Sequence, residues 1–60
     1  MNKENYPLVL DVSHIAEILG ISKRKAYDLM KTGEFPVKQI GKLKRVPKES
    51  FFEWLENQAS

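Results

Sequence analysis

The 60-residue sequence contains no cysteine, one histidine and three glycines that stand far apart. Without cysteine, neither a disulfide nor a thiolate metal site can supplement the core, and one histidine is too few for a metal centre of nitrogen ligands. Separated glycines exclude a glycine-rich phosphate loop. The apolar runs span only a few residues, far short of the ~20 needed to cross a bilayer, and residues 1–7 lack the apolar run of a secretory signal. We therefore expect a single cytoplasmic domain without cofactor, metal or membrane contact, held together by apolar packing alone.

Residues suited to catalysis are also scarce. Asp11, His14 and Ser22 are the one set that could be imagined as hydrolytic. Asp11 and Ser22 are better explained as helix caps, and His14 as an exposed residue in a first helical turn. The sequence predicts no enzyme, no catalytic residue and no small-molecule substrate.

Positive charge is confined to the middle of the chain. The net charge is +2, but residues 20–48 hold nine cationic and two acidic side chains, a formal +7. Residues 1–19 hold one cation against three acids, and the last residues hold three acids and no cation. A central cationic block is typical of a polyanion-binding surface, although the same block can be the solvated face of an ordinary small protein.

The first expected helix covers residues 12–19. Asp11 can accept from the free amides of its first turn, and Gly20 supplies its end. The link to the next helix is then Gly20-Ile21-Ser22, the turn length of a helix-turn-helix unit.

The second expected helix runs from Lys23 to about Lys31, with Ser22 as its N-cap and Gly33 as its stop. Its apolar stripe, expected to be buried, consists of Ala26, Leu29 and Met30. Lys23, Tyr27 and Lys31 recur at four-residue steps on another face, so the cationic side is expected to be the exposed side.

A β-hairpin is expected after Pro36. Two short strands between Val37 and Val46 are joined at Gly41-Lys42, a two-residue loop with glycine first, as a type II′ turn prefers. Val37 and Val46 fall on one face, but Ile40 and Leu43 fall on the other. The alternation therefore leaves open which face is inward.

A third helix is expected from Pro47, in its first turn, to about Asn57. Its apolar stripe is Phe51, Trp54 and Leu55. Phe52 lies off this stripe and either covers Tyr6 or Leu8 or is half exposed. The prediction is a single, mostly α domain with a small hairpin: a winged helix-turn-helix of order α-α-β-β-α, ordered over about 7–57, with frayed ends at 1–6 and 58–60.

The start of the second helix is the strongest candidate for reading DNA, because an α-helix fits the major groove with its N-terminal side chains on base edges. Arg24 is suited to bind guanine O6 and N7 with two parallel hydrogen bonds. Tyr27 either contacts DNA or supports the helix, and Asp28 either pairs within the helix or accepts from cytosine. Ser22, Lys23, Lys25 and Lys31 are expected to contact phosphates.

The hairpin is expected to act as a wing. Lys42 and Lys44 would lie along the DNA backbone, or the tip would enter the adjacent minor groove. For Arg45 the alternative is an inward orientation that braces the second helix. Alternatively, the hairpin cations only protect an exposed sheet edge from pairing.

These motifs together resemble the excisionase-type helix-turn-helix domains, which are related to the MerR-like winged-helix fold. The resemblance covers residues 8–56 and rests on the order and spacing of Ile18-Leu19-Gly20-Ile21-Ser22-Lys23-Arg24, Gly33-Glu34-Phe35-Pro36, Ile40-Gly41-Lys42, Arg45-Val46-Pro47-Lys48-Glu49 and Trp54-Leu55. Lys44, where relatives often carry an apolar residue, and Phe52, where they usually carry a polar one, depart from the pattern.

The resemblance implies recognition-helix contacts from residues 22–25 and Tyr27, and wing contacts from Gly41, Lys42 and neighbouring basic residues. It also implies a bacterial or phage-encoded factor that assists an integrase in excising a mobile element, with further copies of itself on the DNA. A small transcriptional repressor using the same surface, or an adaptor whose basic face binds an acidic protein, are the alternatives.

Overall fold

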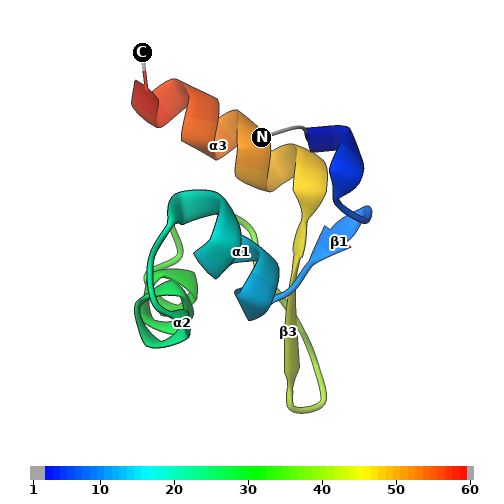
Figure 1. Ribbon diagram of the computed structural model, residues 1–60. Coiled ribbons are helices and arrows are strands. Elements are labelled where there is room, and N and C mark those ends of the chain that lie inside the picture. The colour runs from blue at the N-terminus through cyan, green and yellow to red at the C-terminus, as the bar shows by residue number, and fades with distance from the viewer. Residues whose placement is uncertain (1–2, 60) are drawn as a thin grey trace.

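The computed structural model describes residues 3–59, and the side chains of residues 3–58. Three α-helices and a small antiparallel sheet make up the fold, which is 32 × 20 × 18 Å in extent (Figure 1). In chain order, the elements are η1 (Lys3–Asn5), β1 (Val9–Leu10), α1 (Val12–Leu19), α2 (Lys23–Lys31), β2 (Lys38–Ile40), β3 (Leu43–Pro47) and α3 (Lys48–Ala59). The predicted order α-α-β-β-α is confirmed, and the short elements η1 and β1 are added in front of it.

Local capping explains the bounds of α1. The Asp11 side chain accepts from the His14 amide at 3.1 Å, and the Asp11 amide donates to His14 Nδ1, also at 3.1 Å, so the two residues form a reciprocal capping box. Gly20 ends the helix with φ +67°, a left-handed conformation that glycine adopts without steric cost. His14 is therefore half-buried and part of the cap, and its expected exposure is wrong.

The three-stranded sheet has the order β1-β3-β2 and is antiparallel throughout. In the β2–β3 hairpin, which we call the wing, Lys38 pairs with Arg45 and Ile40 with Leu43. On the other side of β3, Leu10 pairs with Val46. Leu10 and Val46 are fully buried, which settles the question of the inward face: the valine face packs inward, and Ile40 and Leu43 point outward.

Helix α3 begins one residue later than predicted. Pro47 pairs with Val9 and is the last residue of β3, and the Lys48 amide donates to the Leu8 carbonyl at 2.8 Å. The helix continues to Ala59, beyond the expected end at Asn57.

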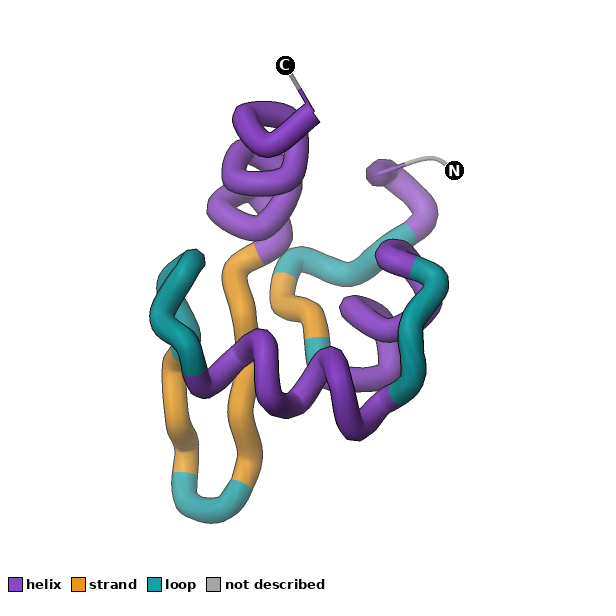
Figure 2. Tube along the Cα trace, turned by 90° about the vertical axis from the view of Figure 1, so that its left-hand side faces the viewer, coloured by secondary structure: helices purple, strands orange, loops and turns teal. Residues whose placement is uncertain are grey.

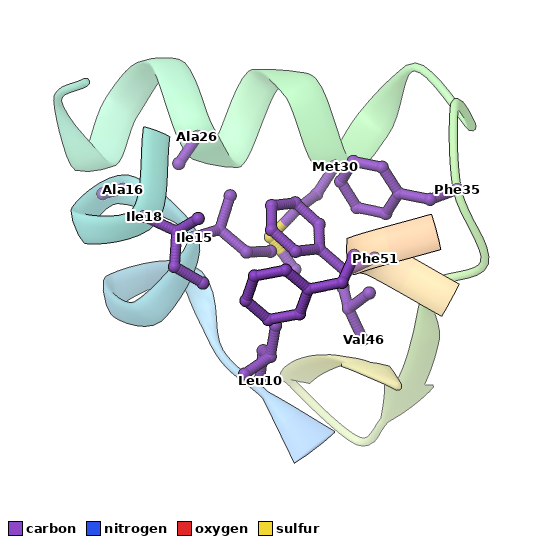
Figure 3. Packing of buried hydrophobic residues seen from close by; sticks show 10 residues of the cluster. Leu10, Ile15, Ala16, Ile18, Ala26, Met30, Phe35, Val46 and Phe51 are labelled. Carbon is purple, nitrogen blue, oxygen red and sulfur yellow. The ribbon is translucent and has the colours of Figure 1, made fainter. Parts of the chain in front are cut away.

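The core lies where α1, α2, β3 and α3 meet, with Phe51 at its centre (Figure 3). The buried residues are Leu10, Ile15, Ala16, Ile18, Ala26, Met30, Phe35, Val46, Phe51 and Phe52. Phe35 packs edge-on against Phe51 and Trp54, with ring centroids 5.2 and 5.0 Å apart. Such aromatic pairs add to the stability gained from burial alone.

Residues 3–5 form η1 and Tyr6 packs on the domain, in the stretch that the sequence predicts to be frayed. Tyr6 packs on Phe52 with ring centroids 6.3 Å apart, while its hydroxyl donates to Glu17 at 2.8 Å. Of the alternatives for Phe52, its packing against Tyr6 is confirmed, and Phe52 is buried. Residues 1, 2 and 60 lie outside the described part of the chain. Within residues 3–59, no helix combines the length and hydrophobicity that a membrane span requires.

Candidate nucleic-acid interface

The N-terminal turn of α2 is exposed and cationic. Ser22 Oγ accepts from the Lys25 amide at 3.1 Å, so this hydroxyl caps the helix as predicted. Lys23, Arg24 and Lys25 are all exposed. The side chains that face solvent at this helix end are therefore long donors with no competing carboxylate in the first turn.

One face of α2 is buried and another is open. Ala26 and Met30 belong to the core, with Leu29 half-buried beside them. Lys23, Tyr27 and Lys31 are exposed, as their four-residue spacing predicts. Packing of the apolar stripe thus turns the cationic face outward.

Tyr27 joins α2 to the wing. Its ring, 41% exposed, lies 4.9 Å from Lys31 Nζ on the same helix and 4.6 Å from Lys44 Nζ on β3. Both distances are within the range of a cation–π contact. The structure therefore brings cations from α2 and from the wing together on one side of the molecule.

An open cavity of about 290 Å³ lies between the start of α1, α2 and β3. It is lined by Asp11, Val12, Tyr27, Met30, Lys42, Leu43, Lys44 and Arg45. Four of these eight residues come from the wing, so a single concave surface connects the wing with α2.

The tip of the wing is a two-residue loop, Gly41-Lys42. Gly41 has φ +63°, whereas Lys42 has a negative φ, the pattern expected for a type II′ turn. Gln39 Nε2 donates to the Gly41 carbonyl at 3.1 Å and steadies the loop. Lys42 is thereby held at the far end of the hairpin, which extends beyond the helices (Figures 1 and 2).

Arg45 is half-buried, and its side-chain hydrogen bond stays within β3. Its Nη1 donates to the Lys44 carbonyl at 3.0 Å. Partial burial acts to raise the pKa of Asp11, but the hydrogen bond from the His14 amide, helped by the charge of Arg45, holds that pKa below its ordinary value of 3.8.

Asp28 is exposed, and among the described residues it forms no ion pair with Arg24 or Lys31. Its intrahelical pairing is therefore not realised in the free protein.

Negative charge gathers away from this surface. Helix α3 carries Glu49, Glu53 and Glu56 and lies at the end of the molecule opposite the wing tip (Figures 1 and 2). Glu49 pairs with Lys3 at 3.0 Å, and Glu34 accepts from Trp54 Nε1 at 3.3 Å. The molecule therefore has a cationic side and an acidic side.

The imagined hydrolytic set does not assemble. Asp11 and His14 bond each other in the cap of α1, while Ser22 caps α2. Within the described part of the chain, no group of three His, Cys, Asp or Glu side chains is placed to hold a metal ion. The side chains that the structure does bring together are cationic donors around an aromatic ring.

Comparison with known proteins agrees with this geometry. A family model described as a helix-turn-helix domain matches residues 9–59, most of the chain. Neither a curated protein nor a solved structure matches significantly. The match begins at β1 and ends with α3, so it includes the wing as well as the two capped helices. The chain therefore belongs to the excisionase-like family of helix-turn-helix domains, and it is a DNA-binding domain.

Proposed function

We propose that this domain binds a specific site in duplex DNA and assists an integrase in excising a mobile element. One observation carries the DNA-binding part of this proposal: Lys31 of α2 and Lys44 of the wing both contact the Tyr27 ring. Because of this contact, α2 and the wing present their cations to one side, and a duplex can meet both at once.

In the proposed complex, α2 lies in the major groove and Arg24 contacts a guanine with two parallel hydrogen bonds. Ser22, Lys23, Lys25 and Lys31 hold phosphates on either side of this contact. The wing follows the backbone or enters the next minor groove, with contacts from Gly41, Lys42, Lys44 and Arg45. Asp28, exposed beside them, is free to accept from a cytosine amino group.

The order of the sequence motifs and the small size of the domain support a role in excision. Deforming an attachment site costs a few kcal/mol, which several protomers and a recombinase can share. We therefore propose further copies of the chain and an integrase as partners on the DNA. The arrangement of two capped helices, a hairpin and a final helix also supports a relationship to the MerR-like winged-helix domains.

An attachment-site recombination assay with and without the protein tests the proposal. We expect excision to depend on the protein and to be lost with Arg24→Ala. Lys3→Ala removes the same charge far from α2 and is the matched control, which should retain activity. Excision that proceeds equally without the protein would refute the role; a footprint on a promoter in that case would favour a transcriptional repressor.

A further inference from the structure

Two large apolar side chains are exposed at the tip of the wing. Ile40 is 66% and Leu43 54% exposed. They are direct cross-strand partners and flank the Gly41-Lys42 loop on either side, so they form one contiguous apolar pair. The tip of the wing extends away from the helices (Figures 1 and 2).

Other side chains of β3 hold the wing against the rest of the domain. Val46 anchors β3 in the core, and Lys44 adds its contact with Tyr27. Both lie on the opposite face of β3 from Leu43, because side chains alternate along a strand. The pair therefore belongs to the face of the wing opposite Val46 and Lys44, where Leu43 borders the open cavity beside α2 and Ile40 is the more exposed of the two.

The surroundings of the pair are cationic. The segment 35–48 contains no acidic residue, and its cations are Lys38, Lys42, Lys44, Arg45 and Lys48. Lys38 and Arg45 are cross-strand partners one pleat away from the pair and on the same face, while Lys42 stands in the loop between the strands. A surface that covers the pair must also accept these charges, which disfavours an ordinary apolar protein surface.

The minor groove of DNA has both properties. Its two rims are lines of phosphates, and between them lie the apolar edges of the deoxyriboses. Apolar side chains that enter this groove partly unstack a base step and kink the duplex toward the major groove. A narrow hairpin tip with cations beside an apolar pair is complementary to such a groove.

We propose that Ile40 and Leu43 form a wedge that enters the minor groove beside the major-groove site of α2 and bends the DNA. Lys38, Lys42 and Arg45 hold the phosphates on the rims. The inference rests on the proposed DNA-binding function and adds to it a bend centred under the wing. Because pyrimidine–purine steps unstack most easily, such a step is expected at a fixed distance from the Arg24 contact.

The test compares wild type with the double variant Ile40→Thr/Leu43→Thr, in which threonine keeps the strand propensity of both positions. The probe is a duplex of about 30 base pairs selected from random DNA by the wild-type protein. This length contains the major-groove site of α2 and the adjacent minor groove, with flanking DNA on both sides. Hydroxyl-radical cleavage reports sugars in the minor groove, methylation of guanine N7 reports the major groove, and energy transfer between end labels reports the bend. Val9→Thr alters another exposed apolar residue of the sheet, 47% exposed and remote from the tip, and is the matched control.

We expect wild type and Val9→Thr to protect one minor-groove window and to bend the duplex by about 20° or more. The double variant should lose the window and the bend, bind about tenfold more weakly, and keep its guanine protection. An unchanged window and bend would overturn the wedge. If the double variant loses only self-association and a single protomer keeps its footprint, the wedge is also overturned, and the apolar pair binds a second copy of the chain instead. If wild type itself binds no duplex, the proposed function fails first, and the inference fails with it.

Discussion

Replacing Tyr27 by alanine tests whether α2 holds the wing in position. The ring contacts Lys31 Nζ at 4.9 Å and Lys44 Nζ at 4.6 Å, one cation from each element. An exposed cation–π contact contributes about 0.5 to 1 kcal/mol, so Tyr27→Ala should lower the free energy of unfolding by about 1 to 2 kcal/mol. For a domain of this size, each kcal/mol corresponds to about 8 °C in Tm.

Thermal unfolding followed by circular dichroism measures the loss, and Tyr27→Phe is the control because it keeps the ring and removes only the hydroxyl. We expect Tyr27→Phe to unfold at the wild-type temperature and Tyr27→Ala to unfold about 8 to 16 °C lower. If Tyr27→Ala instead unfolds within about 2 °C of wild type, the ring does not link the two elements. Weaker DNA binding by Tyr27→Phe at unchanged stability would assign the hydroxyl to a phosphate.

Three further predictions concern the fold that carries this surface. Asp11→Ala should cost about 1 kcal/mol at pH 7, whereas Asp11→Asn keeps a capping acceptor. The pKa of Asp11 in the folded protein lies below 3.8, so its charge stabilises the fold above that pH, and this stabilisation is lost as the pH falls through the folded pKa. The urea midpoint of Asp11→Asn should therefore fall less on acidification than that of wild type. Gly41→Ala forces a left-handed φ on a residue with a Cβ and should cost about 1 to 2 kcal/mol in urea unfolding; an unchanged midpoint would mean that the loop relaxes freely. Phe51→Ala should cost about 3 to 5 kcal/mol, comparable to the whole stability of so small a domain, so its circular dichroism at 25 °C should be that of an unfolded chain, while Phe51→Leu should still unfold cooperatively.

Helix positions were predictable from the sequence because their signals are local. Asp11 and Ser22 cap α1 and α2 with their own side chains, and Gly20 takes the left-handed conformation that ends α1. Each of these interactions spans only a few residues, so residue type and spacing suffice to place it. The capping box of His14 has a local signal as well, since this residue stands at the spacing of a reciprocal cap, but its aromatic side chain is an unusual partner there.

The sheet was less predictable because its register depends on tertiary contacts. The wing carries apolar residues on both faces, and only the burial of Val46 against Leu10 decides which face is inward. Strand β1 consists of two residues, which is too short to show alternation. The contact between Tyr27 and Lys44 joins two elements far apart in the chain, and no sequence spacing encodes it. From the sequence, Lys44 is therefore only a departure from the family pattern, whereas in the structure it contacts the Tyr27 ring.

Salt-dependent DNA affinities test whether α2 and the wing form one DNA-reading surface. The affinities of wild type, Arg24→Ala and Lys42→Ala are measured on a selected duplex and on random DNA over a series of salt concentrations. We expect Arg24→Ala to lose about 1 to 3 kcal/mol of binding free energy on the selected site and much less on random DNA. Lys42→Ala should weaken both alike and reduce the salt slope by about one. Equal losses on both duplexes for Arg24→Ala, or no duplex binding by wild type even at low salt, would contradict the claim that α2 and the wing form one DNA-reading surface.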